Sequence, residues 1–235
     1  MWRRFYMFRG PAAITAATTG SGYTTVRRFP RPIVIPSVAA PVTGFYITAV
    51  IVAPSQTQGQ IVGLEYLLGT INIGTGAFTD GVAMPSKTIR GTSVQTAASL
   101  AFCAVTSAVS GTSTITITYT NQSGTTGRTA SLTLPSSPAL GSAFYIHPHL
   151  QAGDTGIRDV TNITQSGGTG GVVEVYGLLP IRSVASASMA GQDTSPLAVP
   201  ELDVLCEPGE AINVYGVGPT GIGDIAVMLA GVPAT

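Results

Sequence analysis

Residues 114–134 alternate apolar and hydroxyl side chains with a period of two, and this feature constrains the fold more than any other. Ile115, Ile117 and Tyr119 are separated by threonines, and after a polar turn the alternation resumes towards Leu134. Successive side chains of a β-strand point to opposite faces of the sheet. The pattern therefore predicts a β-hairpin with one apolar face and one face of hydroxyl groups.

Short apolar runs recur through the rest of the chain, separated by Gly, Pro, Ser, Asn and Thr. No stretch of about 10–12 residues combines helical periodicity with capping residues, so crossover helices are not expected. Many short strands without helices indicate an antiparallel all-β fold. We predict a β-sandwich of jelly-roll type over residues 44–235.

The first 43 residues differ from this body in composition. They are rich in Arg, Pro, Ala, Thr and Gly, and stretches such as RFPRPIVIP favour extended backbone. Residues 1–31 contain six of the eleven basic residues and none of the eleven acidic residues, although the net charge of the chain is zero. The sequence predicts an extended basic N-terminal arm, residues 1–43, beside a mildly acidic body.

We expect this arm to bind a partner, because arginine and aromatic side chains are typical of interface hot spots. An acidic and apolar neighbouring subunit is the partner that we favour, and the phosphates and bases of nucleic acid are the alternative. The candidate partner-binding residues are Trp2, Arg3, Arg4, Phe5, Tyr6, Phe8, Arg9, Arg27, Arg28 and Arg31.

Residues 33–54 carry no charge and are numerous enough to cross a bilayer. Pro36 and Pro41 interrupt the stretch and its end is β-branched, so we interpret it as extended chain that runs into a first buried strand. The first ten residues lack a continuous apolar segment, so no signal peptide is expected. The sequence thus predicts no membrane contact.

Few residues could support catalysis or bind a metal. His147 and His149 would share one face of a strand and offer two ligands, but no nearby acid or cysteine completes a site, so we expect a surface or interface pair. The glycine pattern of residues 216–221 precedes another apolar strand, which favours a hairpin connection over a phosphate-binding loop. Glu201 and Asp203 could form an acid–base pair or bind calcium, although acids beside Pro and Gly are commonly solvated turn residues.

The two cysteines and the hydroxyl residues add no catalytic motif. Cys103 and Cys206 stand in apolar contexts that are typical of buried free thiols, and no feature indicates the oxidising compartment that a disulfide requires. No G-x-S-x-G nucleophile motif is present. We therefore predict that the protein is not an enzyme, has no catalytic residues and uses no cofactor.

The hairpin ITITYTNQSGTTGRTASLTL and the later segment GDTGIRDVTNITQSGGTGGVVEVYGLLPI together resemble the sequences of structural proteins in virions of tailed bacteriophages. The basic arm and β-body are similar to those of capsid decoration or cement proteins. The resemblance implies assembly in the host cytoplasm, a final location in the virion, binding to the major capsid protein or other virion subunits, and a homo-oligomer. It supplies no catalytic residues. A neck or tail structural protein, or a carbohydrate- or receptor-binding β-module at the virion surface, is the alternative.

The threonine face fits this expectation. Charged residues make up 9% of the chain, against about 25% in ordinary soluble domains. Exposed strands usually remain separate by carrying charged side chains, whereas burying a hydroxyl group costs far less than burying a charge. We interpret the threonine face as a surface that packs permanently against other molecules.

Overall fold

A computed structural model describes residues 4–9, 25–28, 32–35, 43–54, 59–89, 91–185, 204–217 and 225–234, to which all structural statements below refer. Within these ranges every strand pair is antiparallel and no α-helix occurs, which confirms the antiparallel all-β class. The elements are β1 (Arg4–Arg9), β2 (Thr25–Arg28), β3 (Ile33–Val34), β4 (Gly44–Pro54), β5 (Gly59–Asn72), β6 (Phe78–Asp80), β7 (Ser86–Ile89), β8 (Thr92–Gln95), β9 (Leu100–Ser107), β10 (Thr114–Asn121), β11 (Arg128–Thr133), β12 (Ser142–Tyr145), the 3-10 helix η1 (His147–His149), β13 (Ile157–Ser166), β14 (Val172–Ala185), β15 (Leu205–Cys206), β16 (Ala211–Val217) and β17 (Ile225–Ala234).

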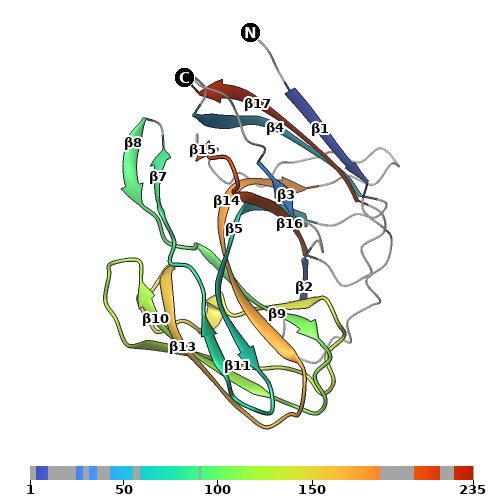
Figure 1. Cartoon of the computed structure of the whole chain (residues 1–235), viewed down its shortest axis with the longest axis vertical. Helices are drawn as coiled ribbons and strands as arrows, with labels where there is room; N and C mark the ends of the chain where they lie inside the picture. The colour runs from blue at the N-terminus through green and yellow to red at the C-terminus, as the bar shows by residue number, and fades with distance from the viewer. Residues whose placement is uncertain are drawn as a thin grey trace.

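The largest sheet closes on itself. Its strands follow the order β3-β16-β2-β12-β9-β14-β5-β6, and β16 also pairs with β5. Strands β5, β14, β9, β12, β2 and β16 therefore form a closed ring (Figure 1). β5 and β14 pair along their whole length, from Gly59 opposite Ala185 to Asn72 opposite Val172.

A three-stranded sheet of order β11-β10-β13 packs against the large sheet. The hairpin predicted for residues 114–134 is confirmed, because β10 pairs with β11 and Ile115 lies opposite Leu132. Ile115, Ile117 and Tyr119 are fully buried and share one apolar core with residues of β5, β9 and β14. Burial of each such side chain contributes roughly 1.5–3 kcal/mol, so the period-two pattern fixes which face points inward.

Side chains on the inner face of the ring form a second cluster. Phe102 stacks on Tyr215 with ring centroids 4.4 Å apart, and Tyr176 belongs to the same cluster. Ala101 and Cys103, the chain neighbours of Phe102, belong to the main core, because successive residues of β9 point to opposite faces. Strand β9 is thus packed with apolar side chains on both faces.

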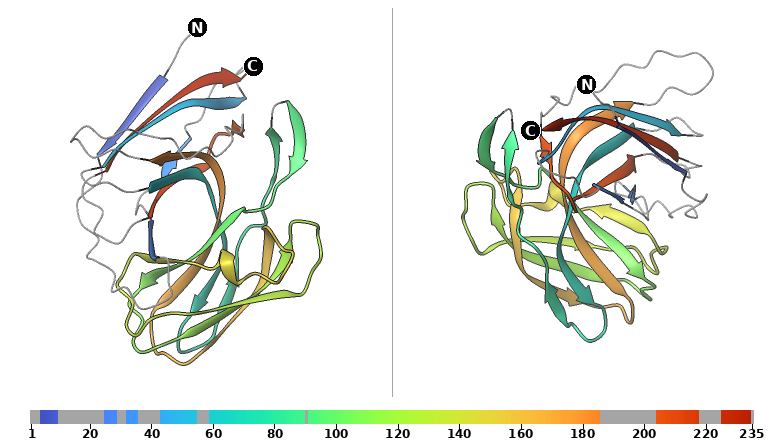
Figure 2. Two further views of the ribbon diagram at one scale, coloured as in Figure 1. Left: turned by 180° about the vertical axis from the view of Figure 1, so that it is seen from behind. Right: turned by 45° about the horizontal axis from the view of Figure 1, so that its top comes forward.

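Three segments of the predicted arm are strands of these sheets. β1 pairs with β17 at the edge of a four-stranded sheet of order β1-β17-β4-β15 (Figure 2), β2 lies between β12 and β16 in the ring, and β3 pairs with β16. The boundary between arm and body at residue 43 stays a prediction. β4 confirms that the apolar stretch of residues 33–54 runs into a strand. In the part of the chain that the structure describes, no helix has the length and hydropathy needed to cross a membrane.

Candidate functional site

The outward face of the three-stranded sheet is a regular array of small polar side chains, here called the hydroxyl face. β10 pairs in register with β11 on one side and β13 on the other, so that three rows of three residues cross the strands. Rows in such a sheet lie about 6.7 Å apart, and neighbours within a row about 4.8 Å apart. The rows are Thr133, Thr114 and Ser166; then Ser131, Thr116 and Thr164; then Thr129, Thr118 and Asn162.

None of the nine side chains of the hydroxyl face carries a charge. The three residues of β10 are half-buried between their neighbours, and five of the six outer residues are exposed. Thr114 Oγ1 lies 2.8 Å from Thr133 Oγ1, and Thr116 Oγ1 lies 2.8 Å from Ser131 Oγ, so hydroxyl pairs hold the surface in a fixed arrangement. Because a hydroxyl group both donates and accepts hydrogen bonds, the face presents donors and acceptors at its outer surface.

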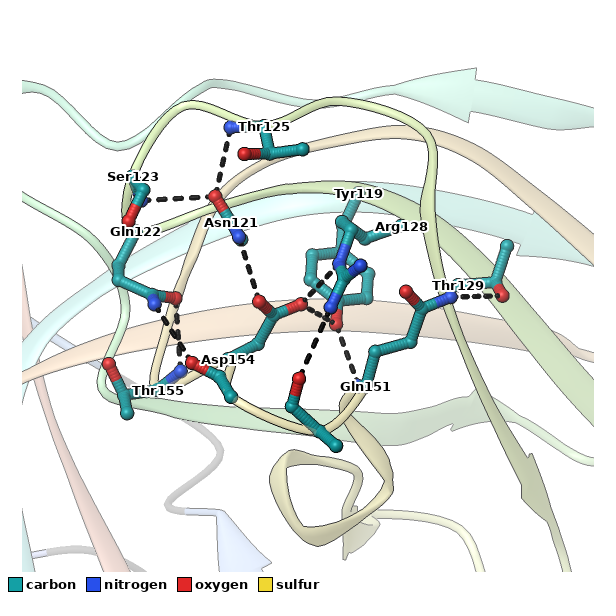
Figure 3. Close-up of polar contacts among 12 residues, drawn as sticks. Tyr119, Asn121, Gln122, Ser123, Thr125, Arg128, Thr129, Gln151, Asp154 and Thr155 are labelled. Carbon is teal, nitrogen blue, oxygen red and sulfur yellow. Dashed lines mark hydrogen bonds and ion pairs between the residues drawn. The ribbon is translucent and has the colours of Figure 1, made fainter.

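A polar network lies at one end of this sheet, where the loop between η1 and β13 meets the β10–β11 turn (Figure 3). The Asp154 carboxylate is its centre: Oδ2 accepts hydrogen bonds from the Tyr119 hydroxyl at 2.7 Å and from Arg128 Nε at 2.8 Å. Oδ1 accepts a third from Asn121 Nδ2 at 2.7 Å. The Asp154 side chain is 3% exposed and accepts from three donors. These bonds hold its loop firmly against the β10–β11 hairpin.

Two amide side chains extend the network along the turn. Asn121 Oδ1 accepts from the backbone N–H groups of Ser123 and Thr125, at 3.0 and 2.9 Å. Gln122 Oε1 accepts from the backbone N–H of Thr155 at 3.0 Å, which ties the turn to the loop. The turn residues 120–122 (TNQ) and the loop residues 153–156 (GDTG) are therefore joined directly. Because these groups bond to one another, the network fixes the loop against the turn.

The hydrogen bond from Arg128, with those from Tyr119 and Asn121, lowers the pKa of Asp154 to about 2. An unfolded aspartate titrates at about 3.9, so the network stabilises the fold fully above about pH 4 and loses this contribution as the pH falls towards 2. We expect Asp154→Asn to be less stable than wild type at pH 7, with a difference that shrinks between pH 4 and pH 2. Urea unfolding at fixed pH values measures this. A difference that does not change with pH would contradict it.

A second charged cluster attaches the β7–β8 hairpin to the turn between β15 and β16. Lys87, the only lysine of the chain, has a side chain that is 1% exposed. Its Nζ donates to Glu207 Oε2 at 2.9 Å and to Glu210 Oε2 at 2.8 Å. Tyr66 donates its hydroxyl proton to Glu210 Oε1 at 2.6 Å, and burial followed by this hydrogen bond raises the pKa of Tyr66. Glu210 follows Pro208 and Gly209 but is held by Lys87 and Tyr66 instead of facing water as turn acids commonly do.

The two histidines do not lie on a strand. They belong to η1, because Pro148 between them lacks the N–H that a ladder requires. The His147 ring stacks on Tyr145 with centroids 5.7 Å apart, and burial lowers the pKa of His147. Among the described residues, no group of three or more His, Cys, Asp or Glu side chains could hold a metal ion.

The other weak candidates have mixed outcomes. Glu201, Asp203 and most of the glycine pattern of residues 216–221 lie outside the described residues. Cys103 and Cys206 are free and buried, which confirms the prediction, and burial raises the pKa of each thiol to about 12. Thiols in such surroundings are inert.

The structure places part of the predicted arm site. Strand β1, whose backbone pairs with β17, contains five of the candidate residues: Arg4, Phe5, Tyr6, Phe8 and Arg9. Arg27 and Arg28 belong to strand β2. The other candidates, Trp2, Arg3 and Arg31, lie outside the described residues. Binding of a partner by these residues stays a prediction.

Comparison with known proteins adds no relative from which a role could be transferred. No protein-family model matches the chain, and no curated protein or solved structure matches it either.

Proposed function

We propose that this chain is a structural, non-enzymatic component of a tailed-bacteriophage particle, namely a capsid decoration or cement protein with a jelly-roll body. In this proposal it binds the major capsid protein or other virion subunits through its arm and its charge-poor β surfaces. The resemblance of the TNQ and GDTG segments to virion proteins supports the proposal, and so does the network around Asp154 that joins these segments.

The hydroxyl face is the observation that carries this proposal. A solvated strand face usually carries charged side chains, which keep molecules apart. Here three strands present nine uncharged polar side chains in register, on a chain with no net charge. Bringing such a face against a neighbour requires no buried charge, and its hydroxyl groups can bond across the contact. These are the properties that a permanently assembled subunit requires.

The location in the particle can be tested by labelling. Antibodies raised against the purified chain, with gold-conjugated secondary antibody, would be applied to intact virions whose genome encodes it. We expect regular gold labelling of the shell in negative-stain images, and none with pre-immune serum. Labelling of the neck or tail would favour the alternative structural role. Virions that neither bind the antibody nor contain the chain by mass spectrometry would overturn the proposal.

A further inference from the structure

The outer edge of the four-stranded sheet is made by a strand from the far N-terminus. β1 pairs with β17 over six consecutive positions without a register shift, from Arg4 opposite Gly231 to Arg9 opposite Ala226. The opposite edge of β17 pairs with β4. β1 is thus an added strand, held by main-chain hydrogen bonds that depend little on side-chain identity.

Without β1, strand β17 would be an open edge. Its ten residues, IAVMLAGVPA, contain no charged side chain. Natural proteins protect such edges with Lys or Glu, with bulges or by covering them, because an exposed apolar edge pairs with other chains. The pairing of β17 with β4 shifts register only between Ala230 and Gly231, and Pro233 lies beyond the stretch that β1 covers. The apolar residues 226–230 therefore have neither a charge nor a proline to protect them, and this part of the edge requires a covering strand.

The covering strand can come from a different copy of the chain. Residues 10–24 connect β1 to β2, which lies in the closed ring. Fifteen residues can span at most about 50 Å, which exceeds the radius of gyration of about 18 Å expected for a compact domain of this length. The strand ladder formed by β1 on a neighbouring β17 would be the same as the one within a single chain. Exchange of β1 between copies therefore changes few interactions. The local concentration of neighbouring chains then decides whether β1 pairs with its own β17 or with that of another copy.

We propose that the β17 edge is a strand-acceptor site and that, in the assembled state, it receives β1 from a neighbouring copy. This inference rests on the proposed function, because a particle supplies the high local concentration that favours exchange. Residues 1–31 are basic and the rest of the chain has an excess of acidic residues, so the body of a neighbouring copy attracts the arm as the chain's own body does. The arm would thus bind its neighbour by adding a strand.

A disulfide test separates exchange from pairing within one chain. Met7 lies opposite Met228 in the register, and Cα atoms of directly opposed antiparallel residues lie about 4.5–5.5 Å apart, within disulfide range. Full-length chains carrying either Met7→Cys or Met228→Cys, one of them with an affinity tag, would be mixed at high concentration and oxidised with diamide. Exchange predicts a disulfide-linked dimer of one tagged and one untagged chain on non-reducing gels. The native cysteines are buried and should not interfere.

The controls make each outcome informative. Met7→Cys mixed with Val232→Cys tests a position four residues away from the register, and should give no dimer. If the matched mixture stays monomeric while the double variant Met7→Cys/Met228→Cys forms a bond within one chain, β1 remains on its own chain and exchange is wrong. If neither bond forms, the β1–β17 acceptor site itself is wrong. Gold labelling of virions can succeed in either case, so the two proposals fail separately.

Discussion

Replacing Lys87 with alanine is expected to lower the free energy of unfolding by roughly 3–5 kcal/mol, the usual loss when one partner of a buried ion pair is removed. The Nζ atom lies within 2.9 Å of both Glu207 and Glu210. Without it, two carboxylates remain side by side, and the 13% exposed side chain of Glu210 loses its counter-charge. Urea unfolding followed by circular dichroism measures the change.

Two further variants separate charge from packing at this cluster. Glu207→Gln should lower the free energy of unfolding by less than about 1 kcal/mol, because the Glu207 side chain is 56% exposed and the ion pair between Lys87 and Glu210 remains. The triple variant Lys87→Met/Glu207→Gln/Glu210→Gln should recover much of the stability lost by Lys87→Ala, since it leaves no unpaired charge. A triple variant as unstable as Lys87→Ala would show that the ammonium group contributes more than charge balance.

The sequence predicts the central hairpin because its information is local. Ile115, Ile117 and Tyr119 alternate with threonines within eight residues, so burial of one face determines the register with β11. The third strand of the hydroxyl face is harder to recognise. The pairing of β13 with β10 contains two register shifts, and the DVTNITQS alternation is interrupted beside them at Thr161 and Asn162, which are both exposed. Thr164 and Ser166 nevertheless repeat the two-residue spacing of the threonines in β10, and this spacing is the sequence signal for a third strand of the hydroxyl face.

Contacts between distant parts of the chain could not be predicted from local patterns. Lys87 bonds to carboxylates 120 and 123 positions away, and nothing near it marks a buried cation except that it is the only lysine. Asp154 likewise reads as a turn residue until the fold brings Tyr119 and Arg128 to it. The ring position of β2 also depends on partners far along the chain, at β12 and β16. In each case the tertiary pairing, not the local propensity, decides the outcome.

Placing a charge at the centre of the hydroxyl face is expected to prevent assembly without unfolding the chain. Thr116 is the middle residue of the middle row, half-buried between Ser131 and Thr164. In Thr116→Lys the long side chain can extend into water in the free molecule, so the loss of stability should stay near about 1 kcal/mol. Against a neighbour the same ammonium group would lose its hydration, which costs several kcal/mol, and each 1.4 kcal/mol weakens binding about tenfold.

We therefore expect self-association of Thr116→Lys to weaken at least about a hundredfold by sedimentation velocity. In cells that express both chains, wild type should replace the variant almost completely in purified virions, as measured by mass spectrometry. Ser93→Lys is the matched control: it adds the same charge at an exposed position of β8, away from the three-stranded sheet, and should be incorporated like wild type. Equal incorporation of both lysine variants would mean that the hydroxyl face stays in contact with water, and the feature that carries the proposed function would then need another explanation.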